Sequence, residues 1–206
     1  MLQGITFRLD DAVPLAVIAA WKQELNWIEK RADAEEEVWE QQRQEMTRRL
    51  AVYEDAGHGA CHLRHPEIAL MVEGALGHFD GQRYDLTAWC IMPNHAHVLI
   101  RTKEGWPVGH VVQSWKRHSG RYANRFLHTS GTPFWAADYH DRFIRDEAHY
   151  WRALHYIHEN PVKAGLCGTA VDWKWSSAAA WTAKLNFAGA EEAREGGLDG
   201  GGAVGG

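Results

Sequence analysis

The sequence predicts an α+β domain of the ferredoxin-like type, in which helices pack on one face of an antiparallel sheet. Two observations support this fold class. Strand and helix patterns follow one another in the order strand, helix, two strands, helix, with a further helix toward the end. The chain of 206 residues also has 45% hydrophobic side chains and 11 tryptophans, which is enough to bury a core.

The first part of the chain contains one short strand and a long helical stretch. Residues Gly4–Leu9 alternate in polarity and end at two aspartates, which indicates a strand. From Leu15 to about Asp55 the apolar spacing is helical and the charges are dense. We therefore expect an exposed helix or helical pair, inserted at about residues 20–55 into a smaller core. An amphipathic helix follows at Pro66–Phe79.

A hairpin is predicted next in the chain. Its strands are Tyr84–Ile91 and His95–Thr102, and the residues Met92-Pro93-Asn94 form the turn. A helix is expected at Pro107–Leu127. The fourth strand of the sheet is expected somewhere within Phe134–Ile144.

The last predicted helix runs from Glu147 to about Asn160. Asp146 is its expected N-cap. Pro161 is expected to end it, because the residue before a proline disfavours the α conformation. Residues 1–182 are thus predicted to form one domain. The Gly, Ala and Glu composition of residues 183–206 predicts a disordered tail.

Composition also limits the location of the protein. The longest apolar run, Ala12–Trp21, contains Pro14 and is too short to span a bilayer, so we expect no membrane partner. The chain begins without the basic and apolar regions of a secretion signal. Three cysteines without a CxxC pair indicate reduced thiols. Together these features predict a cytoplasmic protein.

A basic stretch stands out against the net charge of −5. Residues 105–137 contain no Asp or Glu, and their basic residues are Lys116, Arg117, Arg121 and Arg125. A local stripe of charge matters more to a polyanion than the total charge does, because salt screens each charge beyond about 10 Å. The stretch is either a nucleic-acid contact or an ordinary solvated helix face.

Two histidines open the second strand of the hairpin. His95 and His97 alternate along the strand, so both imidazoles point to one face about 6.5–7 Å apart, while Ala96 and Val98 face the core. Neutral imidazole is a common ligand of divalent metals. An HxH pair alone is weak evidence of a metal site in a chain with 13 histidines.

The last helix carries three polar residues on one face. Arg152, Tyr156 and Asn160 are spaced at i, i+4 and i+8. A tyrosine hydroxyl can act as a covalent nucleophile, and an asparagine offers a carbonyl oxygen to a metal. The alternative is a tyrosine at the edge of the core and an asparagine that ends the helix.

The two motifs together resemble the REP-associated tyrosine transposases of the HUH (histidine–hydrophobe–histidine) single-tyrosine family. The resemblance covers roughly Leu63–Trp181. It rests on four segments in this order: AWCIMPNHAHVLI, FWAADYHDRFIRD, HYIHENPVKAGL and WKWSS.

The resemblance implies a transposase that nicks and rejoins DNA. It implies that His95, His97 and Asn160 bind Mg²⁺ or Mn²⁺, and that Tyr156 attacks DNA to form a 5′-phosphotyrosine. It further implies single-stranded DNA hairpins of repeat elements as partners, no small-molecule cofactor, and a monomer or homodimer. On this hypothesis Lys116, Arg117, Arg121, Arg125 and Arg152 bind the DNA.

Two other functions fit the same residues. One is a catalytically dormant or domesticated DNA-hairpin-binding protein of the same fold. The other is a metal-dependent hydrolase that activates water, but it requires Asp or Glu ligands that the sequence does not place. Zinc binding by Cys61, His62 and His65, or by His155 and His158, is disfavoured because a second ligand pair is missing.

Overall fold

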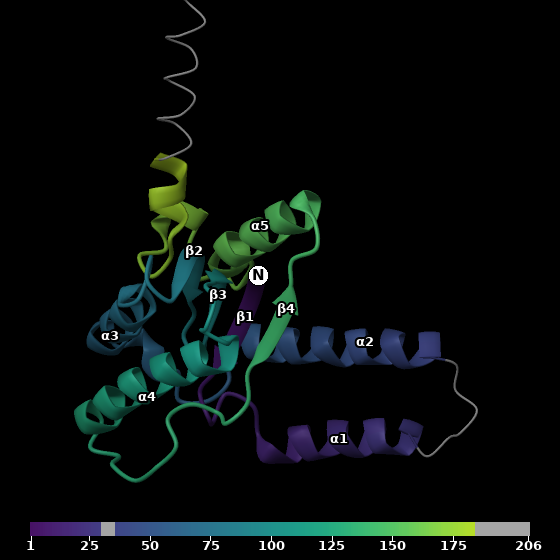
Figure 1. Ribbon diagram of the computed structural model, residues 1–206. Helices are drawn as coiled ribbons and strands as arrows, with labels where there is room; N and C mark the ends of the chain where they lie inside the picture. The colour runs from purple at the N-terminus through teal and green to yellow at the C-terminus, as the bar shows by residue number, and fades with distance from the viewer. Residues whose placement is uncertain (30–35, 184–206) are drawn as a thin grey trace, which may run out of the picture.

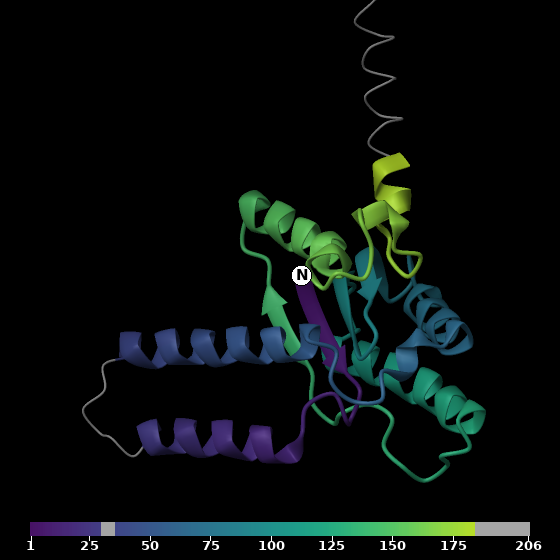
Figure 2. The same cartoon turned by 180° about the vertical axis from the view of Figure 1, so that it is seen from behind.

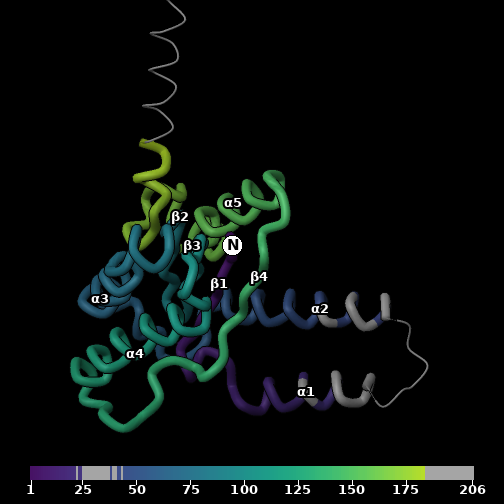
Figure 3. Tube along the Cα trace, in the orientation of Figure 1, coloured from purple at the N-terminus to yellow at the C-terminus, as the bar shows by residue number. Residues whose placement is uncertain are grey.

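The computed structural model describes residues 1–29 and 36–183 (Figures 1 and 3). The strands are β1 (Leu2–Arg8), β2 (Tyr84–Ile91), β3 (His95–Thr102) and β4 (His140–Phe143). The α-helices are α1 (Leu15–Glu29), α2 (Glu36–Asp55), α3 (Pro66–Gly77), α4 (Val108–Phe126) and α5 (Glu147–Lys163). There are also two short 3₁₀ turns, η1 (His62–Arg64) and η2 (Ala170–Asp172), and a short helical segment at residues 178–183.

The four strands form one antiparallel sheet in the order β2-β3-β1-β4. The α+β class and the antiparallel sheet are therefore confirmed. The short strand β4 lies within the segment where the fourth strand was expected, and it pairs with β1 at the edge of the sheet. β3 lies between β1 and β2, which makes it a central strand.

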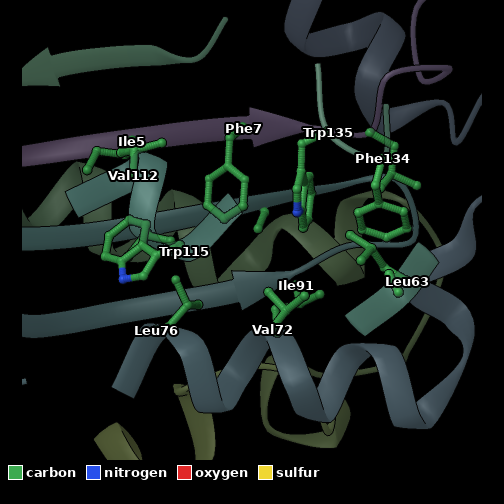
Figure 4. Close-up of a cluster of buried hydrophobic side chains, with 14 of the residues drawn as sticks. Ile5, Phe7, Leu63, Val72, Leu76, Ile91, Val112, Trp115, Phe134 and Trp135 are labelled. Carbon is green, nitrogen blue, oxygen red and sulfur yellow. The ribbon is translucent and has the colours of Figure 1, made fainter. Parts of the chain in front are cut away.

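One face of the sheet is covered by α3 and α4. Alternate residues of the strands, such as Ile5, Phe7 and Val98, pack there against apolar residues of both helices (Figure 4). Trp115 of α4 is almost fully buried, and its ring lies 6.1 Å from that of Phe7. This face holds the larger of the two apolar clusters.

The opposite face of the sheet is covered by α5, so the expectation of helices on one face alone was wrong (Figures 1 and 2). Leu154 and Ile157 of α5 pack there on Cys90 and Leu99 of the sheet. The physical reason is that β2 and β3 carry apolar side chains on both faces, and each face gains free energy when it is removed from water.

Helices α1 and α2 form the expected helical pair. They lie side by side and extend away from the sheet (Figures 1 and 2). Trp21 of α1 packs edge-on against Tyr53 of α2, with 6.1 Å between the ring centroids. Glu24 and Arg49 add an ion pair of 3.5 Å between the helices. The C-terminal end of α2 returns the chain to the sheet.

Helix α5 begins as predicted and ends later than predicted. The Asp146 side chain accepts a hydrogen bond of 2.7 Å from the backbone N–H of His149, which confirms the N-cap. Pro161 does not end the helix, which continues to Lys163. A proline this close to the C-terminus removes only one internal hydrogen bond, and the Ala164 N–H closes the last turn by donating to the Asn160 carbonyl.

Within the described residues, no helix is both long and apolar enough to cross a membrane. The side chains of Cys61, Cys90 and Cys167 carry free thiols. The tail predicted for residues 183–206 lies almost entirely outside the described residues.

Candidate metal centre and basic surface

His95 and His97 point from the central strand β3 toward α5. Because side chains alternate along a strand, they share a face with Leu99, while Ala96 and Val98 face the larger core, as predicted. His95 is fully buried and His97 is 4% exposed. The two Nε2 atoms are 2.9 Å apart, so the rings converge on one point.

Two side chains from other elements reach the same point. Asp55, the last residue of α2, places Oδ1 3.3 Å from Nε2 of His95. Candidate ligand atoms of Asp55, His95 and His97 all lie within 4.8 Å of one another. Asn160 of α5 places its amide nitrogen 2.6 Å from Nε2 of His97. Elements far apart in the sequence thus bring four potential ligands together.

The donor set fits a divalent cation. Asp55 Oδ1 and Asn160 Oδ1 are buried oxygens without a hydrogen-bond partner among the described residues. Burial, with His95 next in importance, holds the pKa of His97 well below its usual value, so its imidazole is neutral and offers a lone pair. Unpaired buried oxygens are costly unless a cation or donor satisfies them. Imidazole nitrogens together with carboxylate and amide oxygens are common ligands of divalent metal ions.

Each histidine is also held through its other ring nitrogen. His95 Nδ1 lies 2.8 Å from Oδ1 of Asn94, and His97 Nδ1 lies 2.8 Å from the hydroxyl of Thr6 on β1. Such contacts fix the ring orientation of metal-binding histidines.

Tyr156 lies on α5 one turn before Asn160. Its ring packs edge-on against His97, with 5.3 Å between the ring centroids. Burial raises the pKa of Tyr156 to about 12, with a further contribution from Asp55, while a hydrogen bond with Asn160 opposes the rise. The phenol is therefore protonated at neutral pH, and it must lose its proton to act as a nucleophile. Lys163 lies near the same ring, with Nζ 5.2 Å from its centroid.

The sequence interpretation missed Asp55. The residue closes a helix rich in Asp and Glu, so its type and spacing do not distinguish it from a solvated surface charge. The only local signal is the turn at Gly57, which shows that the chain changes direction just after Asp55. Its position beside His95 depends on how α2 docks on the sheet.

The alternative zinc ligands do not assemble. Cys61 Sγ donates to the Gly57 carbonyl at 3.1 Å, and the rings of His62 and His65 are 6.3 Å apart. His158 forms a hydrogen bond of 2.9 Å with Ser177. In the described part of the chain, the cluster of Asp55 with the two strand histidines is the one His/Cys/Asp/Glu group with metal-binding spacing.

The five basic residues predicted to bind DNA lie in three different environments. Arg117, Arg121 and Arg125 are exposed on α4. Lys116 is half-buried and donates from Nζ to the backbone carbonyls of three residues that precede Tyr139: Ala136, Ala137 and Asp138. Arg152 is exposed on α5, on the opposite side of the sheet.

The exposed α4 arginines line a cavity of about 550 Å³. Arg83 enters the same cavity, and its guanidinium lies 3.3 Å from the Phe79 ring centroid and 4.1 Å from that of Trp106. The remaining lining residues are mostly polar or aromatic: Met71, His110, Gln113, Ser114, His118 and Tyr122. Arg83 was not anticipated, because its approach to Trp106 and to the α4 arginines depends on how α4 packs on the sheet.

Part of the sequence matches a known family model. Residues 76–160, which include both strand histidines, Tyr156 and Asn160, match the family model described as "Transposase IS200 like". The matched segment is less than half of the chain. Asp55 and the α1–α2 pair lie outside it.

Part of the chain is also similar to two curated REP-associated tyrosine transposases. It is 26% identical over 95 residues to the REP-associated tyrosine transposase of Escherichia coli (strain K12), covering 46% of this chain and 54% of the relative. It is 27% identical over 105 residues to a putative REP-associated tyrosine transposase of Haemophilus influenzae, covering 46% and 58%. The match spans little more than half the length of these curated relatives.

A solved structure described as the REP-associated tyrosine transposase bound to a REP hairpin is also similar. Its TM-score is 0.49 at 15% sequence identity, and the alignment covers 85% of this chain and 75% of that chain.

Proposed function

We propose that the chain is a metal-dependent, single-tyrosine transposase that nicks and rejoins single-stranded DNA at hairpin-forming repeats. The observation that carries the proposal is the convergence of four potential metal ligands beside Tyr156. His95, His97 and Asn160 lie with Tyr156 in the segment that matches the IS200-like transposase model, and Asp55 lies outside it. The choice of repeat DNA as substrate follows the names of the curated relatives.

Tyr156 is the proposed nucleophile. Its hydroxyl oxygen attacks the phosphorus of the scissile phosphodiester, and the bond between phosphorus and the 3′ oxygen breaks. The products are a 5′-phosphotyrosine and a free 3′-hydroxyl, which takes up a proton in exchange for the one that the tyrosine loses. A later attack by a 3′-hydroxyl on the phosphotyrosine rejoins DNA and restores the tyrosine, so no outside energy source is needed.

His95, His97 and Asn160 are the proposed ligands of Mg²⁺ or Mn²⁺, with Asp55 as a fourth donor. When bound, the ion neutralises charge that develops on the non-bridging oxygens of the phosphate. Asn160 lies one helical turn from Tyr156, so the same helix presents the nucleophile and a ligand.

The basic residues are proposed to hold the DNA on both sides of the sheet. Arg152 lies on α5 one turn before Tyr156, so it is suited to a phosphate near the cut. The α4 arginines and Arg83 lie over the other face of the sheet, so they are suited to a part of the DNA away from the cut. A guanidinium group can donate two parallel hydrogen bonds to one phosphate, which makes arginine well suited to binding the DNA backbone.

The test is to incubate the protein with a single-stranded hairpin oligonucleotide and Mn²⁺, and to separate the products on a denaturing gel. Wild type should give a covalent protein–DNA adduct, and Tyr156→Phe should give neither adduct nor cleavage while still binding the hairpin. Tyr150→Phe is the matched control, because it removes a hydroxyl from the same helix and should leave the adduct intact. An adduct formed by Tyr156→Phe but not by Tyr150→Phe would reassign the nucleophile.

A second candidate is a metal-dependent hydrolase that activates water. Asp55 favours it, because it provides a carboxylate ligand that the sequence did not place. The same gel distinguishes the two functions: a hydrolase cuts without an adduct, and Tyr156→Phe cuts as well as wild type. Hairpin binding without cleavage in any metal would instead identify a dormant DNA-binding protein.

A further inference from the structure

Asn94 occupies the tight turn between β2 and β3, directly before His95. Its side chain is fully buried. The amide nitrogen Nδ2 donates to two backbone carbonyls, those of Glu54 and His58, at 3.0 Å each. The amide oxygen Oδ1 lies 2.8 Å from Nδ1 of His95. The amide therefore bridges the metal-site strand and the C-terminal end of α2.

These contacts fix the direction of the Asn94 amide. A backbone carbonyl can only accept a hydrogen bond, so the atom that faces Glu54 and His58 must be the NH₂ group. The carbonyl oxygen of the amide then faces His95, and it too can only accept. Nδ1 of His95 must carry the proton, which leaves a lone pair on Nε2. Nε2 is the atom that faces His97 and Asp55.

His97 has no equivalent restraint. Its Nδ1 atom faces the Thr6 hydroxyl, which can donate or accept a hydrogen bond. The Thr6 contact therefore orients the ring but does not determine its tautomer. His97 serves as an internal comparison for His95.

The other end of the amide holds the segment that carries Asp55. Glu54 precedes Asp55, and His58 follows the turn at Gly57, so the two accepting carbonyls flank the carboxylate on either side. The turn itself is anchored to the body of the protein. The Leu9 N–H donates to the Asn94 carbonyl at 2.8 Å, and the Leu63 N–H donates to the Pro93 carbonyl at 3.1 Å.

We propose that Asn94 is a positioning residue of the metal centre, which holds His95 in its Nδ1–H tautomer and fixes the end of α2 so that Asp55 lies beside Nε2. This inference rests on the proposed metal-dependent function. The Asn94 side chain then positions two ligands from separate elements, His95 and Asp55. The metal centre is complete only when α2 is docked on the sheet. The α1–α2 pair thereby contributes to the site, although it lies outside the segment that matches the transposase family.

The test measures the tautomer and the metal affinity separately. Long-range ¹H–¹⁵N spectra of protein labelled with ¹⁵N-histidine report which ring nitrogen carries the proton, and the signals of His95 are identified by their loss in His95→Gln. The affinity for Mn²⁺ alone is measured by titration calorimetry without DNA. The proteins compared are wild type, Asn94→Ala, Asn94→Asp and Asn124→Ala.

Wild type should show His95 with the proton on Nδ1. Asn94→Ala should lose this fixed tautomer and bind Mn²⁺ about 10–100-fold more weakly, the usual effect of removing a group that orients a metal ligand. Asn94→Asp should keep the tautomer, because a carboxylate also accepts from Nδ1. It should melt at a lower temperature than wild type, because it cannot donate to the two carbonyls. This variant tests the inference even if Asn94→Ala does not fold.

Asn124→Ala is the matched control. The Asn124 amide donates to the Thr132 carbonyl at 2.7 Å and accepts from the Thr129 hydroxyl at 3.2 Å, so its loss removes similar hydrogen bonds far from the histidines. Its Mn²⁺ affinity and histidine spectrum should equal those of wild type.

Two results separate the inference from the proposed function. An Asn94→Ala protein with wild-type Mn²⁺ affinity and an unchanged His95 tautomer would overturn the positioning role and leave the metal centre standing. A wild-type protein that binds neither Mn²⁺ nor Mg²⁺ would overturn the metal centre. In that case the tautomer, which is measured without metal, still decides whether Asn94 fixes His95.

Discussion

His95 and His97 differ from the other histidines of the chain in their surroundings. Both are buried on a central strand, both are held through Nδ1, and both direct Nε2 at the same point. His158, by contrast, is satisfied by the Ser177 hydroxyl. Burying the Nε2 lone pairs of both histidines together with unpaired oxygens costs free energy unless a cation binds them.

Substitution of either strand histidine should therefore abolish cleavage. We expect His95→Ala or His97→Ala to leave the fold and hairpin binding largely intact, because the ion is needed for chemistry more than for shape. Asn160→Ala should be milder, because a water molecule can replace a neutral oxygen ligand. Cleavage is measured by gel assay with Mn²⁺, and the fold by circular dichroism. Cleavage by wild type that persists in excess EDTA would contradict a metal-dependent reaction.

At the scale of elements, α4 has two sides with different tasks. Its apolar side, with Trp115, packs on the sheet, while Arg117 and Arg121 line the basic cavity. Lys116 has a structural role, because its ammonium group donates to backbone carbonyls of the segment before Tyr139. The position of a basic residue on the helix thus determines whether its side chain is available for the proposed DNA contact.

The double variant Arg117→Ala/Arg121→Ala should weaken hairpin binding and flatten its salt dependence. Each lost phosphate contact should reduce the slope of log K against log salt by about 0.7–0.9. Fluorescence anisotropy at several salt concentrations measures the slope. Lys116→Met is the comparison: it should lower stability by about 1 kcal/mol, because hydrogen bonds to three backbone carbonyls are lost, and change the slope less. An unchanged slope in the double variant would place the DNA elsewhere.

The layer of α3, α4 and β2 depends on one buried hydroxyl. Tyr84 on β2 donates to the Leu76 carbonyl at 2.6 Å and accepts from Nε1 of Trp115 at 2.8 Å. Tyr84→Phe leaves both partners buried and unpaired, so it should lower the free energy of unfolding by about 1–3 kcal/mol in urea denaturation. Tyr150→Phe, which removes a hydroxyl from a half-buried ring, should cost much less. Equal effects of the two variants would show that the buried hydroxyl adds nothing.

At the scale of the whole molecule, the two faces of the sheet are specialised. One face carries the main core under α3 and α4, and the other carries the candidate metal centre under α5 (Figure 1). The α1–α2 pair extends from the body and returns one carboxylate to the site (Figure 2). A central strand buried on both faces provides a rigid support for the two histidines, which favours a fixed ligand geometry.

The C-terminal tail should be dispensable to this assembly. Residues after about Phe187 have too few apolar side chains in their sequence to dock, so their deletion should leave thermal stability and DNA nicking unchanged. Differential scanning calorimetry and the gel assay measure the two properties. A fall of several degrees in the melting temperature on truncation would show that the tail packs on the domain.

Local sequence patterns predicted most of the secondary-structure elements and part of the candidate site. Alternation predicted the hairpin and the common face of His95 and His97, and helical spacing put Tyr156 and Asn160 on one face, because strand and helix geometry are local. The tertiary fold brings α5 over the second face of the sheet and turns Lys116 to backbone carbonyls. It also places Asp55 beside His95 and connects Asn94 to the end of α2. These contacts connect residues distant in the chain, and their formation depends on how the helices dock, which no local pattern encodes.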